Sequence, residues 1–256
     1  GHNIAHLYSG GRVINIDILG FGSDLRGISN SDDGGYITYG ATNNTFSHID
    51  PGAIFVPKEN SLGWIIKWNK NGKIEYTSSF GQVENAKNDY HNSFIGIIER
   101  KDGSLKAIYD MEEENITENG FDIENKSSSY NLLILKYAVK NKEKMSPKIT
   151  NWKYLHSSAE ITALCDTKDG GYIFGGDYSK NKKNFIDDKK DNTEVVLNTE
   201  NDYYSGNNGV ICKYNESSKL EWYTQIEGKG SSKINSIIET EDGFIVSETY
   251  NGQNII

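Results

Sequence analysis

The sequence predicts an all-β fold made of repeated four-stranded antiparallel sheets. Three observations predict it. A ten-residue segment ending in Asp-Gly recurs four times, at intervals of about 70 residues. Each copy is followed by further short runs rich in β-branched and aromatic residues, and no long segment has the apolar spacing of a helix. Four-stranded sheets repeated at such a period are typical of a β-propeller, so the expected fold is a β-propeller of four-stranded antiparallel blades with long insertions between the second and third strands.

The first two strands of each repeat are predicted as a hairpin around the Asp-Gly. The first-strand segments are residues 25–34, 94–103, 161–170 and 234–243. They align without a gap and share a small residue at Gly27, Gly96, Ala163 and Ser236. Glycine after Asp tolerates the positive φ of a tight turn, and the small residues suit innermost strands crowded around a central channel. The second strands are expected at residues 35–40, 104–109, 171–176 and 244–247.

The third strand has its own pattern of three apolar residues, a lysine and an aromatic residue. It occurs at residues 64–68, 133–137 and 210–214, which places Lys67, Lys136 and Lys213 at one position of the repeat. We interpret these lysines as structural pairing residues. The fourth strand is expected at residues 73–76, 149–152 and 219–222, after turns such as Asn71-Gly72 and Ser217-Ser218.

The motifs of residues 169–176, 209–215 and 220–222 resemble the propeller repeats of bacterial secreted and surface proteins, which share a DGGY run and a later Trp-Ile-x-Lys pattern. The resemblance covers residue 12 to the C-terminus and is strongest in the first and third repeats. Repeat two departs from it at Ser104 and in a long turn at residues 141–147. The resemblance implies a secreted or cell-surface location in a bacterium, and it specifies the fold far better than the function.

The expected organisation is an N-terminal tail or tag remnant at residues 1–11, followed by one propeller domain at residues 12–256. Residues 12–19 are predicted as an orphan outermost strand, and the fourth repeat has its first two strands only. Pairing of residues 12–19 with residues 249–256 closes a small ring of four blades. We favour the alternative, a fragment of a larger propeller, because Asn254-Ile255-Ile256 is not followed by a lysine and an aromatic residue. Open sheet edges then favour self-association.

Composition excludes several classes of partner and structure. The net charge of −9 argues against nucleic-acid binding, which needs clustered Lys and Arg. No apolar run is long enough to predict a transmembrane segment. The two cysteines, Cys165 and Cys212, are expected two strands apart in one sheet, too far for a disulfide, and are predicted to be free buried thiols.

Long insertions between the second and third strands occur at residues 42–62, 110–131 and 177–208. In a propeller they all leave from the same face, so we expect a ligand-binding rim there; loops without a binding role are the alternative. The candidate ligand-binding residues are Asp110 and Asp177 at the ends of equivalent second strands, and Tyr203 and Tyr204 in a Tyr-, Ser-, Gly- and Asn-rich stretch.

An acidic run in the second insertion is the candidate metal site. Glu112, Glu113 and Glu114 offer the hard oxygens that Ca²⁺ prefers, but the run lacks the D-x-D-x-D-G spacing of a specific calcium loop. A solvated acidic loop is therefore the alternative, and no other cofactor is expected.

The predicted function is an extracellular or cell-surface ligand-binding or adhesion module without catalytic activity, with a protein or a glycan as its partner. No HExxH or Gly-x-Ser-x-Gly motif is present. The alternative is a carbohydrate-active propeller enzyme that uses the paired carboxylates of Asp110 and Asp177. A purely structural scaffold is a third hypothesis.

Overall fold

The fold is all-β and antiparallel in a computed structural model of the chain. The structure describes residues 3–9, 12–18, 23–42, 61–82, 93–111, 115–118, 121–124, 131–138, 148–157, 159–179, 185–188, 193–196, 207–227 and 230–251. Within these ranges there is no helix long and apolar enough to cross a membrane.

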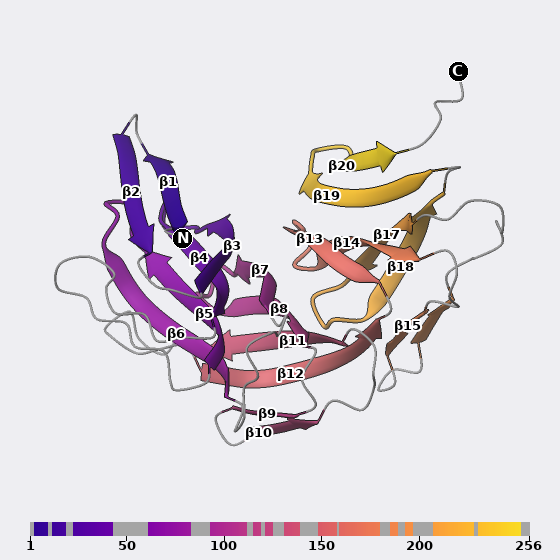
Figure 1. Cartoon of the computed structure of the whole chain (residues 1–256), viewed down its shortest axis with the longest axis horizontal. Coiled ribbons are helices and arrows are strands. Elements are labelled where there is room, and N and C mark those ends of the chain that lie inside the picture. Colours follow the sequence, from indigo (N-terminus) through magenta and orange to yellow (C-terminus); the bar gives the residue numbers. More distant parts are fainter. Residues whose placement is uncertain are drawn as a thin grey trace. The chain divides into compact units, whose positions relative to one another are not determined.

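The predicted four-stranded repeat is present, and Figure 1 shows its strands in chain order. The third repeat is the plainest case, because its sheet is the simple meander β13-β14-β17-β18. The strands of the four repeats are β3 (Ser23–Asn30), β4 (Tyr36–Thr42), β5 (Ser61–Trp68) and β6 (Ile74–Gln82); β7 (Ser93–Glu99), β8 (Leu105–Met111), β11 (Asn131–Ala138) and β12 (Lys148–Ser157); β13 (Glu160–Asp166), β14 (Tyr172–Ser179), β17 (Asn207–Tyr214) and β18 (Leu220–Ile226); and β19 (Ser231–Glu239) with β20 (Phe244–Asn251). Their arrangement as propeller blades stays a prediction.

Two insertions contain short hairpins that the sequence did not predict. The hairpin of β9 (Asn115–Glu118) and β10 (Phe121–Glu124) adds to the edge of β6, through the pair Gln82 and Thr117. The hairpin of β15 (Phe185–Asp188) and β16 (Thr193–Val196) adds to β12 in the same way. Each insertion therefore extends the sheet of the preceding repeat and covers an edge strand that otherwise presents unpaired backbone groups.

The N-terminal residues also form a sheet. The predicted strand at residues 12–19 is found as β2 (Arg12–Ile18), and it pairs with β1 (Asn3–Ser9), which lies in the expected tail. Closure of a ring by residues 12–19 stays a prediction. The chain divides into two compact units, Gly1–Lys126 with Ile134–Trp152, and Ser127–Leu133 with Lys153–Ile256.

Three of the four Asp-Gly turns have the predicted geometry; the fourth differs, because Gly243 has a φ of 155° and its carbonyl oxygen accepts the Thr240 N–H. Gly34, Gly103 and Gly170 have φ of 80°, 78° and 83°, the left-handed region that glycine adopts without strain. Asp169 Oδ1 accepts the Gly171 N–H at 2.8 Å, which closes the turn from within. Gly171 is needed for another reason, because an added Cβ would lie 2.3 Å from the Tyr214 carbonyl oxygen of the third strand.

A β-bulge recurs on the first strand of every repeat, immediately before the small residue. The register shifts between Leu25 and Gly27, and the three other repeats shift at the same place, between Phe94 and Gly96, Ile161 and Ala163, and Ile234 and Ser236. A bulge places two residues opposite one and turns the strand locally. The recurring small residue therefore marks a backbone irregularity, a reason that the pattern alone did not reveal.

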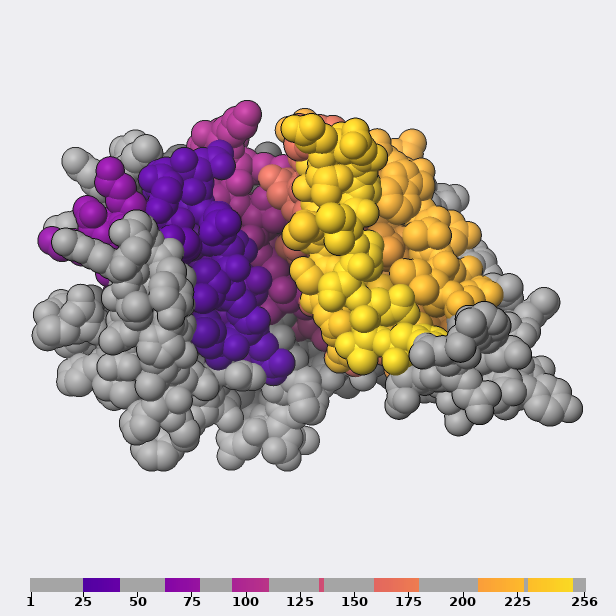
Figure 2. All heavy atoms as spheres, turned by 90° about the horizontal axis from the view of Figure 1, so that it is seen from above, coloured from indigo at the N-terminus to yellow at the C-terminus, as the bar shows by residue number. Residues whose placement is uncertain are grey.

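Two pairs of neighbouring repeats, one within each unit, pack through the first strand of the later repeat. In the first unit, β7 lies against β3 and β4. In the second unit, Ile234 and Ile237 of β19 form one apolar cluster with Ala163, Ile173 and Ile211. Figure 2 shows the β19–β20 hairpin (yellow) beside β17 and β18 (orange).

Both cysteines are free, as predicted, and they occupy the predicted strands of the third repeat. Cys212 is fully buried, whereas Cys165 is half-buried, so the expectation of burial is confirmed for Cys212 alone. Burial raises the pKa of both thiols.

We expect a thiol reagent such as DTNB to label at most one cysteine of the native protein at neutral pH, and slowly, because the thiolate is the reactive form. In denaturant both should react at once. A Cys165→Ser variant isolates Cys212, which should then show no native labelling; rapid labelling of that variant would contradict the burial of Cys212.

Candidate functional site

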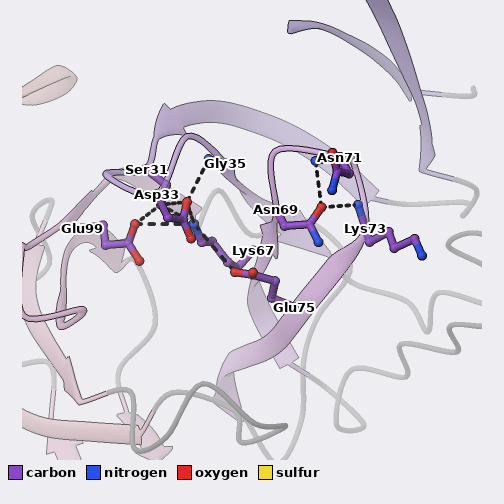
Figure 3. Close-up of polar contacts among 9 residues, drawn as sticks. All are labelled: Ser31, Asp33, Gly35, Lys67, Asn69, Asn71, Lys73, Glu75 and Glu99. Atoms are coloured by element: carbon purple, nitrogen blue, oxygen red, sulfur yellow. Dashed lines mark hydrogen bonds and ion pairs between the residues drawn. The ribbon is translucent and has the colours of Figure 1, made fainter. Parts of the chain in front are cut away.

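The two ends of each repeat have different chemistry. The turn end carries the Asp-Gly turn, and the loop end carries the long insertion after the second strand. In the first repeat the ammonium of Lys67 lies 2.7 Å from Asp33 Oδ1 of the Asp-Gly turn. It also donates to the hydroxyl of Ser31, which in turn contacts Glu99 of the second repeat. Figure 3 shows these contacts converging on one buried lysine.

The third repeat has the same network. Lys213 Nζ lies 2.8 Å from Asp169 Oδ2, 2.9 Å from Glu221 Oε2 and 3.1 Å from the Tyr214 carbonyl oxygen. Glu221, like Glu75 in the first repeat, is the extra residue of a second bulge, on the fourth strand. The contact to the next repeat also recurs, because Glu239 accepts the Lys168 N–H at 2.8 Å.

The network lowers the pKa of both turn aspartates. Burial by itself raises the pKa of Asp33, but hydrogen bonds from Lys67, Ser31 and the Gly35 N–H outweigh it and lower the pKa to about 2. The hydrogen bond from Lys213, with those from Thr167 and Gly171, holds the pKa of Asp169 well below its usual range. Both carboxylates are ionised, and each pairs with the buried lysine of its own repeat. The turn end therefore has a structural role, not a binding role. The interpretation of Lys67 and Lys213 as structural residues is confirmed; the side chain of Lys136 lies outside the described residues.

The loop end of the third repeat is different. Asp177, near the end of β14, is only 5% exposed. Its Oδ2 accepts a hydrogen bond from Asn207 Nδ2 at 2.6 Å, and the Asn207 N–H donates to Ser231 Oγ of β19 at 3.1 Å. Among the described residues, Asp177 Oδ1 accepts no hydrogen bond.

An ion pair borders this carboxylate. Glu160 lies opposite Asp177 in the register of β13 and β14, and Glu160 Oε1 is 3.5 Å from Lys233 Nζ of β19. Burial raises the pKa of Asp177, the Asn207 hydrogen bond opposes that rise, and the charge of Glu160 adds to it. Asp177 therefore carries the opposite pKa shift from the turn aspartates.

A second group of polar side chains lies near the same ends of β14 and β17, on the face of the sheet opposite Asp177. The hydroxyl of Tyr178 accepts hydrogen bonds from Gln225 Nε2 at 2.5 Å and Asn208 Nδ2 at 3.3 Å. The Asn208 side chain is buried, and its Oδ1 has no hydrogen-bond partner in the described part of the chain.

The first repeat shows that these polar residues are not required by the fold. Alignment through the turn and strand registers places Ala41 where the third repeat has Asp177, and Ser61 and Leu62 where it has Asn207 and Asn208. The turn-end residues recur in the first and third repeats, whereas the loop-end aspartate of the second and third repeats is absent from the first. The loop end of the third repeat is therefore the candidate functional site, formed by Glu160, Asp177, Asn207, Ser231 and Lys233.

The structure gives the following positions for the residues predicted from sequence. Asp177 is at the centre of the candidate site. Asp110 lies near the end of β8, opposite Ser93, and is half-buried. Tyr203, Tyr204, Glu112, Glu113 and Glu114 lie outside the described residues. The calcium prediction therefore stays a prediction, and the described residues contain no group of three acidic, His or Cys side chains placed to hold a metal.

Sequence reasoning missed Glu160, Ser231 and Lys233, and it placed Asn207 and Asn208 only within the Tyr-, Ser-, Gly- and Asn-rich end of the third insertion. Each reads as an ordinary polar surface residue, and only the strand register places them around Asp177. A position-by-position comparison of the repeats could have found the site, because the third repeat has Asp177 where the first has Ala41. A scan of the chain against protein-family models gives no match, and a search of curated proteins gives none either.

We expect Lys67→Met to lower the free energy of unfolding by about 1–3 kcal/mol at neutral pH, because it leaves partly buried carboxylates without their cation. The folded-state pKa of Asp33 is about 2, below its value of about 3.9 in an unfolded chain. Its stabilisation is therefore complete above about pH 4 and is lost as the pH falls through about 2. Urea unfolding across this range should show the wild type and Lys67→Met converging at acid pH; a constant difference would contradict the ion-pair account.

The same substitution at the two ends should act in opposite directions. Asp169→Asn removes a paired carboxylate and should lower the free energy of unfolding at pH 7 by about 1 kcal/mol. Asp177→Asn keeps the shape and removes a carboxylate whose raised pKa makes ionisation costly in the folded state. Its free energy of unfolding at pH 7 should equal or exceed that of the wild type, and the gain should vanish below about pH 4, where the wild-type group is protonated in both states. Greater destabilisation by Asp177→Asn than by Asp169→Asn would reverse our assignment of the two ends.

Proposed function

We propose that the protein is a ligand-binding or adhesion module, extracellular or on a bacterial cell surface, that binds through the loop-bearing end of a β-propeller and performs no catalysis. The propeller is supported by the repeated meander and by the way the first strand of one repeat packs against the preceding sheet. The location rests on the resemblance of the repeat motifs to those of bacterial secreted and surface proteins.

The observation that carries the proposal is the buried oxygen Asp177 Oδ1, which accepts no hydrogen bond in the described residues. An unsatisfied buried carboxylate acceptor costs free energy. The first repeat avoids it with Ala41. The second repeat has an aspartate, Asp110, at the equivalent position. Because the first repeat folds without this carboxylate, the cost of burying it in the third repeat is best explained by a partner that supplies the missing donor.

The chemistry of the site defines the partner. Asp177 Oδ1 is an acceptor, Lys233 is a donor, and Glu160 adds negative charge. Such a set suits a ligand rich in hydroxyl or amide donors, a description that fits a glycan or a polar protein loop. The long insertion at residues 177–208, with Tyr203 and Tyr204, starts and ends at this site and would contribute further contacts.

The test is binding of the intact protein to glycan and protein arrays, followed by Kd measurements on the hits. Asp177→Ala removes the acceptor and should weaken a true ligand at least about tenfold, the effect of losing one hydrogen bond to a charged group. Asp169→Asn is the matched control, an aspartate of the same strand pair at the turn end, and it should bind as the wild type does. Binding unchanged in Asp177→Ala would remove this site from the proposal.

The second candidate function is a carbohydrate-active enzyme that uses Asp110 and Asp177. One observation favours it: a buried carboxyl with a raised pKa suits a general acid. Release of reducing ends from the array glycans by the wild type, lost in the Asp110→Asn, Asp177→Asn double variant, would establish it. Activity that survives in the double variant would exclude these residues as its catalytic pair.

A further inference from the structure

The fourth Asp-Gly turn, which joins β19 to β20, is built differently from the other three (Figure 1). Residues 240–243 connect its two strands, whereas the connections in the other repeats are residues 31–35, 100–104 and 167–171. The fourth turn is therefore one residue shorter. The residue that it lacks is the one that follows the Asp-Gly pair in each longer turn.

That residue holds the aspartate carboxylate in the longer turns. Its N–H donates to the aspartate Oδ1 at 2.8 Å, and the three donors are Gly35, Ser104 and Gly171. In the first and third repeats the ammonium groups of Lys67 and Lys213 bind the same carboxylate. Asp242 is exposed and makes no hydrogen bond or ion pair within the described part of the chain. The shortened turn thus leaves this carboxyl group unheld.

The backbone nitrogen that follows the aspartate also differs. In each longer turn the glycine N–H donates to the carbonyl oxygen three residues earlier, from Gly34 to Ser31, from Gly103 to Arg100 and from Gly170 to Thr167. The carbonyl oxygen of Gly243 accepts the Thr240 N–H at 2.8 Å and the Thr240 hydroxyl at 3.1 Å. The Gly243 N–H, however, has no backbone acceptor among the described residues. A Cβ added to Gly243 would meet no atom within 4 Å, so the space beside this residue is open.

An unheld aspartate carboxyl group and an adjacent free glycine N–H are the two reactants of succinimide formation. The Gly243 nitrogen attacks Cγ of the protonated Asp242 carboxyl group. The N–Cγ bond forms, the Cγ–OH bond breaks, and the hydroxyl group leaves with the amide proton as water. Water then opens the five-membered ring at one of its two carbonyl groups. One opening restores aspartate, and the other gives isoaspartate, in which the main chain runs through Cβ and Cγ.

We propose that Asp242 is a modification site at which the folded protein forms a succinimide and then isoaspartate, while the other three Asp-Gly turns resist the reaction. At those turns the glycine N–H and the carboxylate must first leave their hydrogen bonds, which raises the barrier. The low pKa of Asp33 and Asp169 also disfavours the protonated carboxyl group that reacts. Only water takes part besides the chain itself, and the proposal does not depend on the ligand site at Asp177.

Peptide mapping of the folded protein after prolonged incubation in mildly acidic buffer tests the proposal. The isoaspartate peptide has the mass of the aspartate peptide, but it elutes separately and is identified by electron-transfer fragmentation. The succinimide peptide is lighter by one water molecule. Asp242 should convert at least about tenfold faster than Asp33, Asp102 or Asp169 in the same digest. Mapping by site is necessary because Asn-Gly pairs such as Asn71-Gly72 also yield isoaspartate, by deamidation.

Two controls separate the effect of the fold from that of the local sequence. In denaturant the four Asp-Gly pairs should convert at similar rates, because the hydrogen bonds of the turns are lost. A variant with one glycine inserted between Gly243 and Phe244 restores the length of the other turns, and it should slow conversion of the folded protein to the rate at Asp169. Circular dichroism should show that this variant is folded.

Three results would overturn the proposal. The first is a native Asp242 that converts no faster than the other three aspartates. The second is an insertion variant that is folded and still converts at the wild-type rate. The third is an advantage of Asp242 that persists unchanged in denaturant, because the local sequence and not the short turn would then be its cause.

Discussion

The buried lysine of the third strand is the interaction on which the repeats depend. An ammonium group removed from water needs its three donors satisfied and its charge balanced. Lys213 meets both needs with Asp169, Glu221 and the Tyr214 carbonyl group. Each acceptor comes from a different local feature: an Asp-Gly turn, a bulge on the fourth strand and the lysine's own strand. The requirement therefore fixes the register of three strands at one point.

The same lysine links one repeat to the next. Lys67 reaches Glu99 of the second repeat both directly, at 3.6 Å, and through Ser31. Buried ion pairs contribute little net stability compared with apolar packing, but a wrong alignment leaves a buried charge unpaired. Apolar contacts such as those of Ile234 on Ile173 tolerate sliding, whereas this network tolerates none. The apolar cluster supplies the packing energy and the polar network specifies the alignment.

The predictable part of the fold is the part governed by local patterns. Asp-Gly turns and runs of β-branched residues predicted the four-stranded meander, the positive φ of Gly170 and the pairing role of Lys213. The hairpins β9–β10 and β15–β16 were missed because their strands are only four residues long, with at most two apolar residues each, and because they are held by the edge of a sheet distant in sequence. The bulges were missed because an extra residue such as Thr162 looks like any strand residue. At the candidate site Asp177 was predicted from its position at a strand end, but Asn207, Ser231 and Lys233 meet it only through tertiary pairing.

The contrast between Asp169 and Asp177 explains where function is able to arise in such a molecule. Both aspartates belong to the same hairpin of the third repeat, one at its turn and one at its open end. At the turn, every acceptor is committed to holding strands in register, so a change there affects folding first. At the open end the hydrogen bonds of the sheet are already made, and the first repeat folds with Ala41 in place of the carboxylate. Side chains at the open end are therefore not needed to hold the strands together, and they differ between the first and third repeats. The cost of burying Asp177 is therefore a better guide to function than the turn aspartates and buried lysines, whose role is to hold the strands in register.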